Sequence, residues 1–149
     1  MSHLRPILLA EDNPNDAELT LTALESAHIA NPVVHARDGV EALDFLHHRG
    51  AYTDRPPTAP AVVLLDLKMP RIDGHEVLLQ IRGDPDLRSL PVVVLTSSRE
   101  EIDLVESYRL GANSYVVKPV RYEEFVAAVA RLGIFWALLN EPPPLAALS

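Results

Sequence analysis

The sequence predicts an α/β protein with a doubly wound, five-stranded parallel sheet between two layers of helices. Three observations lead to this fold class. Short apolar runs bounded by polar or turn residues recur along the chain. Three of these runs, at residues 7–10, 62–65 and 92–95, are apolar throughout, as expected of parallel strands that helices cover on both faces. The segments between the runs have the length and the apolar spacing of helices.

The predicted strands are residues 6–10, 32–36, 61–65, 91–95 and 114–117. A segment of helical length follows each of them, so one strand and one helix repeat five times in a (βα)5 sandwich of three layers. Parallel strands joined in this way have right-handed crossovers. At this chain length the natural strand order is the flavodoxin-like order 2-1-3-4-5.

The expected helices carry apolar residues at a spacing close to 3.6. The first contains Ala17, Leu21 and Leu24, and the second contains Val40 and Leu43. Asparagine and aspartate precede these segments, and their side chains can accept hydrogen bonds from the free amides at the start of a helix. The helix starts are therefore marked in the sequence.

Composition and charge exclude several classes of function. The 149-residue chain has the size of one domain, a formal net charge of −8 and no cysteine. It has no basic face for nucleic-acid phosphates, and without cysteine it forms neither disulfides nor thiolate zinc sites. No apolar run has the length of a membrane span. We expect a soluble, cytoplasmic protein with no nucleic-acid or membrane partner.

The domain organisation is expected to be simple. Residues 5–139 form one predicted domain, and residues 140–149 form a tail. Three consecutive prolines, Pro142 to Pro144, keep the tail extended because proline lacks the amide hydrogen that a helix requires. Nothing after Leu139 is long enough for a second domain, so the sequence predicts a domain that acts by itself.

Polar side chains stand where four of the apolar runs stop. The first run ends in Glu11 and Asp12, the third in Asp66, the fourth in Thr96 and the fifth in Lys118. In a doubly wound sheet, ligands bind outside the carboxyl ends of the strands. We therefore expect these side chains to lie together at one edge of the sheet.

This set of side chains predicts phosphoryl chemistry. Carboxylates that lie close together either raise a pKa or bind a cation, and hard oxygen ligands favour Mg²⁺, which is commonly held by one or two carboxylates together with phosphate oxygens. An aspartate can form an acyl phosphate if a metal and a lysine neutralise the phosphoryl oxygens. We predict a Mg²⁺ site at which Asp66 accepts a phosphoryl group, contacted by Lys118 and by the Thr96 hydroxyl.

Each of these residues also has an ordinary structural explanation. Asp12 is a candidate helix N-cap, Asp66 a turn residue, Thr96 the cap of a following helix and Lys118 a solvated charge. The functional interpretation is favoured because all of them occur, in order, at strand ends of one sheet.

The residues around these positions resemble the receiver domains of two-component response regulators. The resemblance covers residues 5–138 and rests on four motifs, Leu9-Ala-Glu-Asp-Asn, Leu65-Asp-Leu-Lys-Met-Pro-Arg-Ile-Asp-Gly, Leu95-Thr-Ser and Val117-Lys-Pro. It implies that a sensor histidine kinase phosphorylates the protein and that the signal leaves through a protein surface.

The resemblance also implies roles for the residues that hold the metal and the phosphoryl group. Asp66 is the implied phosphoacceptor and Asp12 a direct metal ligand. Glu11 acts mostly through water, and the backbone carbonyl of Lys68 completes the protein's ligands.

The resemblance also implies roles for two switch residues and for two backbone features near the site. Thr96 is drawn toward the phosphoryl group and Tyr115 turns inward with it; the structural alternative for Tyr115 is a half-buried strand aromatic. The Lys118–Pro119 bond is implied to be cis. Gly74 is implied to supply a backbone shape that residues with a Cβ avoid.

The last predicted helix is apolar on more than one stripe, so we expect a second surface to cover it. We predict a homodimer surface that includes Phe125, Phe135 and Trp136; the alternative is that Phe135 and Trp136 close the core of their own domain. This region and the tail resemble the small response regulators paired with bacterial phytochromes. That resemblance implies a phytochrome as the kinase and a C-terminal arm that contributes to dimers.

Two other functions fit parts of the pattern. Enzymes of the haloacid dehalogenase type also use an aspartate after a buried strand, but they need a second acid two residues later, where this chain has Lys68. A scaffold of the same fold without phosphorylation would not need the complete set of acids, hydroxyl and lysine. The glycine patterns of P-loop and dinucleotide folds follow none of the predicted strands. We expect a phosphoacceptor switch, whose chemistry is limited to its own phosphorylation and dephosphorylation, and not an enzyme.

Overall fold

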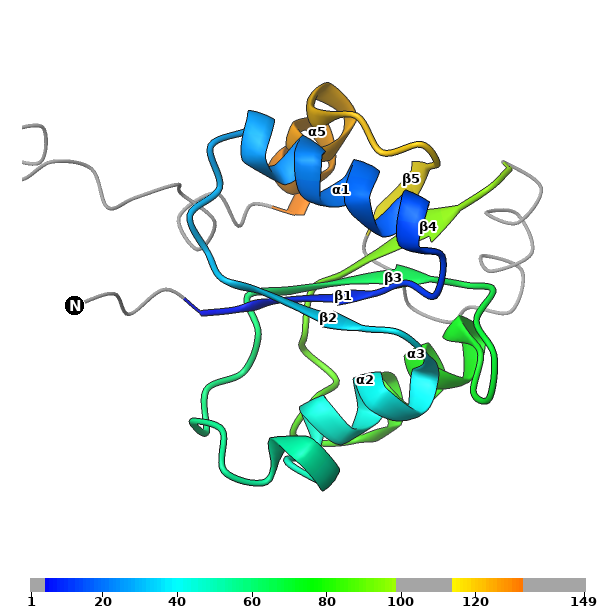
Figure 1. Cartoon of the computed structure of the whole chain (residues 1–149). Helices are drawn as coiled ribbons and strands as arrows, with labels where there is room; N and C mark the ends of the chain where they lie inside the picture. Colours follow the sequence, from blue (N-terminus) through cyan, green and yellow to red (C-terminus); the bar gives the residue numbers. More distant parts are fainter. Residues whose placement is uncertain (1–4, 99–113, 133–149) are drawn as a thin grey trace, which may run out of the picture.

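The computed structural model describes residues 5–98 and 114–132, and of residues 129, 131 and 132 it describes the backbone alone. Five parallel strands form one sheet in the order β2-β1-β3-β4-β5, which confirms the predicted topology (Figure 1). The strands are β1 (Ile7–Ala10), β2 (Val33–Ala36), β3 (Val62–Asp66), β4 (Val92–Thr96) and β5 (Ser114–Val117).

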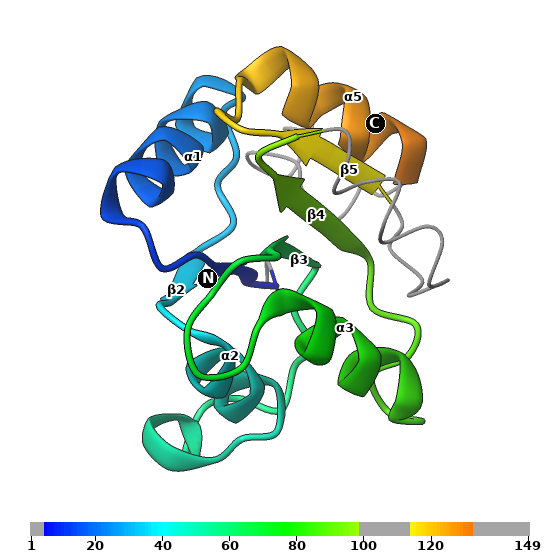
Figure 2. The ribbon, with the colours of Figure 1, turned by 90° about the vertical axis from the view of Figure 1, so that its right-hand side faces the viewer.

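Helices cover both faces of the sheet, so the layers are those of the predicted sandwich. Figure 2 shows α1 and α5 on one face and α2 and α3 on the other. The described helices are α1 (Pro14–Ser26), α2 (Gly39–Leu46), the short 3₁₀ helix η1 (Gly50–Tyr52), α3 (Gly74–Gly83) and α5 (Tyr122–Leu132). The helix expected between β4 and β5 falls outside the described residues.

Four strands begin one residue later than predicted, and three of them, β1, β2 and β4, begin directly after a proline. Pro6, Pro32 and Pro91 have no amide hydrogen to donate to a neighbouring strand. Their carbonyl oxygens accept hydrogen bonds of 2.8, 2.8 and 2.9 Å from the amides of Ala61, Ile7 and Val63. At the other end, β3 and β4 extend one residue further than predicted. Asp66 and Thr96 are therefore the last residues of their strands.

Capping side chains start three helices at the carboxyl edge of the sheet. Asn13 accepts hydrogen bonds from the amides of Asn15 and Asp16 at the start of α1. Asp38 caps α2 through the amide of Glu41, and the residue before Gly74 caps α3 in the same way. Since α1, α2 and α3 each begin after the carboxyl end of a strand, their N-termini all face this edge.

The core lies on both faces of the sheet, and its composition corrects one prediction. Phe125 of α5 is 1% exposed and packs with the apolar residues of β1, β3 and β4 on the α1 and α5 face. It therefore offers no surface to a second chain, and its assignment to a dimer surface is wrong. The amphipathic spacing of α5 places this ring on the inner side of the helix. Phe135 and Trp136 lie outside the described residues.

Candidate functional site

Three acidic side chains meet at the carboxyl edge of the sheet. Glu11 and Asp12 follow β1, and Asp66 ends β3, the strand next to β1. Each offers one carboxylate oxygen, and these oxygens lie within 4.8 Å of one another. Glu11 and Asp66 are buried, whereas Asp12 is exposed. An all-oxygen cluster with one side open to solvent fits a hard divalent cation that keeps some of its waters.

Asp12 is not the cap of the following helix. The cap of α1 is Asn13, whose side chain accepts from the amides of Asn15 at 2.9 Å and Asp16 at 3.0 Å. The carboxylate of Asp12 is therefore not used to start the helix. The structural alternative for this residue does not apply.

Glu11 is the most deeply buried member of the cluster. Its Oε2 accepts a hydrogen bond of 3.2 Å from the amide of Asn13, and its Oε1 accepts one of 3.1 Å from the Lys118 ammonium. Burial, together with a hydrogen bond to Asp66 and its negative charge, raises the pKa of Glu11 to about 8. Without a cation, burial and the neighbouring Asp66 carboxylate therefore favour the protonated form of Glu11.

The Lys118 ammonium is the centre of the site. Its Nζ lies 3.0 Å from Asp16, 3.1 Å from Glu11 and 3.3 Å from the Oδ2 of Asp66. Burial alone would lower the pKa of Lys118, but the hydrogen bond to Asp16 and the charges of Asp66 and Glu11 raise it above the ordinary value for lysine. The ammonium therefore stays charged beside the Asp66 carboxylate at every physiological pH.

The backbone around Lys118 fixes where its side chain starts. The Lys118 amide donates a hydrogen bond of 2.6 Å to the carbonyl of Thr96, and the Lys118–Pro119 peptide bond is cis, as the resemblance implies. Thr96 and Lys118 are thus joined at the ends of β4 and β5.

The two residues of the implied switch occupy different environments. Thr96 is fully buried, and its hydroxyl donates to the carbonyl of Ser98 at 3.0 Å. Tyr115 is half-buried and packs against the core cluster beneath α2 and α3. Both stand on strands next to the site, but their switch roles stay predictions.

The loop after Asp66 approaches the site through its backbone. The amide of Lys68 donates to Asp66 Oδ1 at 3.2 Å, so one carboxylate oxygen of Asp66 is held by the loop itself. The metal-ligand role of the Lys68 carbonyl stays a prediction.

The reason predicted for Gly74 is wrong. Gly74 is the first residue of α3 and is not among the residues with positive φ. A Cβ at this position would collide with the carbonyl oxygen of Asp66 and would lie 2.6 Å from the Cα of Leu67. Glycine is required here by the close approach of two backbone segments.

Sequence reasoning missed Asp16. This residue lies in the first turn of α1, and its carboxylate reaches the Lys118 ammonium across the top of the sheet. No local pattern identifies it, because Asp12 lies before the start of α1 and so gives no helical spacing from which the position of Asp16 follows.

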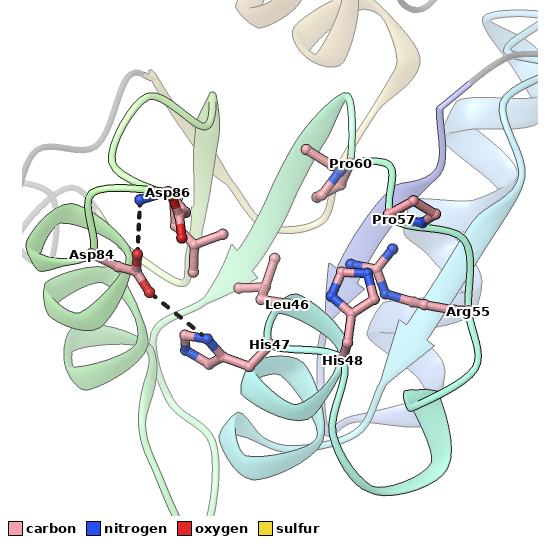
Figure 3. A pocket seen from close by; sticks show the side chains of 10 residues that line it. Leu46, His47, His48, Arg55, Pro57, Pro60, Asp84 and Asp86 are labelled. Carbon is pink, nitrogen blue, oxygen red and sulfur yellow. Dashed lines mark hydrogen bonds and ion pairs between the residues drawn. The ribbon is translucent and has the colours of Figure 1, made fainter.

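A cavity of 280 Å³ lies elsewhere, between the C-terminal ends of α2 and α3 and the loop after η1 (Figure 3). His47 and Asp84 face each other across it, with Nδ1 and Oδ2 3.8 Å apart, and Arg55 borders its other side. None of the predicted site residues lines it. The candidate site is therefore the acidic cluster and not this cavity.

Within residues 5–98 and 114–132, no helix combines the length and the apolar character needed to cross a membrane.

Comparisons with known proteins agree with this geometry. The family model of the response regulator receiver domain matches residues 7–130. The chain is 39% identical over 130 residues to response regulator Rcp1 of Synechocystis sp., and the match covers 87% of each protein.

Two solved structures of bacteriophytochrome response regulators are similar over nearly the whole chain. AtBRR is 63% identical, with a TM-score of 0.88 over 94% of this chain and 100% of the other. RtBRR is 59% identical, with a TM-score of 0.88, and the match covers 95% of this chain and 85% of RtBRR. The Mn²⁺-bound form of Rcp1 is 38% identical, with a TM-score of 0.71, and the match covers 94% of this chain and 99% of Rcp1.

Proposed function

Because the chain belongs to the response regulator receiver family, we propose that it is a switch whose Asp66 accepts a phosphoryl group from a sensor histidine kinase. The observation that carries the proposal is the convergence on Asp66 of a lysine ammonium at 3.3 Å and of two further carboxylates. One cation is in place to neutralise a phosphoryl oxygen, and the acids beside it can hold a second.

The transfer itself is a displacement at phosphorus. An oxygen of the Asp66 carboxylate forms a bond to the phosphorus of the kinase phosphohistidine while the phosphorus–nitrogen bond breaks. The phosphohistidine reacts with its other ring nitrogen protonated, so the bonding electrons leave as a lone pair on the released nitrogen and the histidine departs as neutral imidazole. The Lys118 ammonium, already beside Asp66 Oδ2, can donate a hydrogen bond to a phosphoryl oxygen without a large movement.

Glu11, Asp12 and Asp66 would hold the divalent cation, together with the backbone carbonyl of Lys68. When bound, a Mg²⁺ ion supplies positive charge for the phosphoryl oxygens. The cluster's oxygen-only chemistry supports this assignment. A similar protein, response regulator Rcp1, has a solved Mn²⁺-bound form, which supports it as well.

The switch acts through Thr96 and Tyr115. A phosphoryl oxygen offers the Thr96 hydroxyl a charged acceptor that is stronger than its present partner, the Ser98 carbonyl. Exchange of that partner moves the end of β4, and Tyr115 on the adjacent β5 follows it inward.

We also propose a bacterial phytochrome as the kinase and a homodimer formed through the C-terminal segment with Phe135 and Trp136. The support for the kinase is the identity of 59% and 63% to two bacteriophytochrome response regulators. The apolar sequence of the C-terminal segment supports the dimer.

The test uses a small phosphodonor, so that no kinase has to be identified first. The full chain is incubated with acetyl phosphate and Mg²⁺, and intact mass is followed together with oligomeric state. We expect an acid-labile adduct of one phosphoryl group, as an acyl phosphate requires. Asp66→Asn should abolish it, whereas Asp54→Asn, which neutralises an exposed acid in the loop after η1, should leave it unchanged. An equal adduct on the Asp66 variant would disprove the proposal.

A further inference from the structure

The Lys118 ammonium makes three contacts with acids, and they are not equivalent. Ammonium has three hydrogens to donate, and Asp16, Glu11 and Asp66 accept at 3.0, 3.1 and 3.3 Å. The Lys118 side chain is 14% exposed, so these carboxylates replace most of its water. The shortest of the three contacts is to the residue with no part in the predicted site.

Two of these three partners change when the switch is used. Glu11 and Asp66 belong to the acidic cluster that can hold a cation, and Asp66 is also the proposed phosphoacceptor. Once its oxygen is bonded to phosphorus, Asp66 loses the anionic charge that it offers to Lys118. Asp16 is outside the cluster, so its contact with the ammonium is free to persist through the reaction.

The backbone of Asp16 is held on both sides. Its amide donates to the Asn13 side chain at 3.0 Å, and its carbonyl accepts from the hydroxyl of Thr20 at 3.0 Å. Thr20, one turn further along α1, is fully buried. The Asp16 carboxylate therefore projects from a fixed point in the first turn of the helix, half-shielded from water.

We propose that Asp16 is a positioning residue, which holds the Lys118 ammonium at the phosphoacceptor site and remains its partner when Asp66 is phosphorylated. The inference rests on the proposed function of Asp66. A lysine side chain has many rotamers, and a catalytic cation is effective only if it is already in place when charge develops. Asp16 restricts the ammonium to the position from which it meets the phosphoryl group, and α1 thereby becomes part of the site.

The test compares phosphorylation rates with acetyl phosphate at saturating Mg²⁺, which removes kinase docking from the measurement. Loss of one charge-assisted hydrogen bond should slow Asp16→Asn on the order of tenfold. Asp16→Glu should recover part of the rate because it keeps the charge. The matched control is Glu18→Gln, which removes one acidic charge from an exposed position of the same helix. The control should react like the wild type.

A double variant separates positioning from a purely structural role. If Asp16 acts through Lys118, then Asp16→Asn should slow the reaction by less than about twofold in a chain that already carries Lys118→Ala. If the Lys118→Ala chain is phosphorylated too slowly to measure, a second measurement replaces the comparison of rates. Nuclear magnetic resonance of the Lys118 ammonium should show faster hydrogen exchange with water in Asp16→Asn and normal exchange in Glu18→Gln.

The outcomes distinguish this inference from the proposed function. A wild-type chain that gains no phosphoryl group on Asp66 would overturn the function itself. A wild type that is phosphorylated, beside an Asp16→Asn variant with the same rate and the same ammonium exchange, would overturn only the role of Asp16. If Asp16→Asn slowed phosphorylation in the Lys118→Ala chain by as much as it does in the wild type, Asp16 would act through the fold and not through Lys118. That result would also overturn the role proposed for Asp16.

Discussion

The backbone of Gly74 lies so close to the carbonyl oxygen of Asp66 that no β-carbon fits between them. The first turn of α3 is therefore packed directly on the residue that we propose as phosphoacceptor. The hydrogen bond of 2.9 Å from the Gly74 amide to the carbonyl of Leu67 closes the same loop.

We expect Gly74→Ala to destabilise the protein by about 1–3 kcal/mol, the usual cost of an overpacked site, and to slow phosphorylation of Asp66. Chemical denaturation and the acetyl phosphate assay measure the two effects. Gly83 at the end of α3 is the matched control, because a Cβ there would meet nothing within 4 Å. Gly83→Ala should leave phosphorylation unchanged and stabilise by up to about 1 kcal/mol. Equal stability of the two variants would contradict the packing argument.

Asp12 and Asn13 are neighbours with separable roles. Asp12→Asn should lower Mg²⁺ affinity at least about tenfold, because it removes one charged ligand, while the stability of the metal-free protein stays the same or rises. Asn13→Ala should cost about 1 kcal/mol of stability through loss of the N-cap and should alter Mg²⁺ affinity much less. Titration calorimetry measures the Mg²⁺ affinity of each variant, and thermal unfolding measures its stability without metal. A loss of stability in the Asp12 variant would show that this residue supports the helix after all.

We expect Glu11 to make the binding of Mg²⁺ at the proposed site depend on pH. Burial, and then the hydrogen bond and charge of Asp66, raise its pKa to about 8 from the ordinary value of 4.5. A cation has to displace this proton, so affinity should rise by up to about tenfold per pH unit below pH 8 and level off above it. Calorimetric titrations at several pH values measure the slope. In Glu11→Gln the slope should be much flatter; an equally steep slope would assign the proton to another group.

The same pKa affects stability in the absence of metal. The unfolded chain loses the Glu11 proton near pH 4.5, whereas the folded chain keeps it to about pH 8. Between these values the folded state binds more protons, so the contribution of Glu11 to the free energy of unfolding falls as pH rises. Urea unfolding of metal-free protein from pH 5 to 8.5 should show a decline that Glu11→Gln reduces. No change in the pH profile would refute this account.

Arg71 has a strained backbone and an ion pair that can be tested separately. Its φ is 70°, a conformation in which a Cβ is unfavourable, and its guanidinium lies 3.1 Å from Asp38, the cap of α2. The pair is solvent-exposed on the arginine side and should contribute less than about 1 kcal/mol. Both Arg71→Ala and Arg71→Gly lose the ion pair, but only Arg71→Gly relieves the backbone strain at this position. We expect the glycine variant to be more stable by about 1 kcal/mol in denaturant titrations; the reverse order would be inconsistent with strain.

The sheet and most of the candidate site could be predicted from the sequence because both depend on the ends of buried strands. Continuous apolar runs identify the covered strands, and the polar residue after each run then falls at a known edge. The starts of β1, β2 and β4 were displaced by one residue because the proline before each of them can accept but not donate a backbone hydrogen bond.

The residues that sequence reasoning missed or misassigned depend on tertiary packing. Asp16 contacts Lys118 across 102 positions of sequence, through a helix orientation that no local pattern specifies. Gly74 is required by the approach of α3 to Asp66 and not by its own backbone angles. Phe125 belongs to a helix with apolar residues on several sides, and composition alone does not identify the side that faces the sheet.

The N-termini of α1, α2 and α3 at the carboxyl edge of the sheet shape the electric field that an approaching phosphodonor meets. The chain as a whole carries a net charge of −8 and repels anions at long range. Each helix N-terminus carries a partial positive charge of about half a unit, which acts over a short distance. An anionic donor is thus repelled by the protein as a whole and attracted only at the entrance of the site. Added salt should therefore accelerate its encounter with the site, because ions screen the distant repulsion before they weaken the contacts at the entrance.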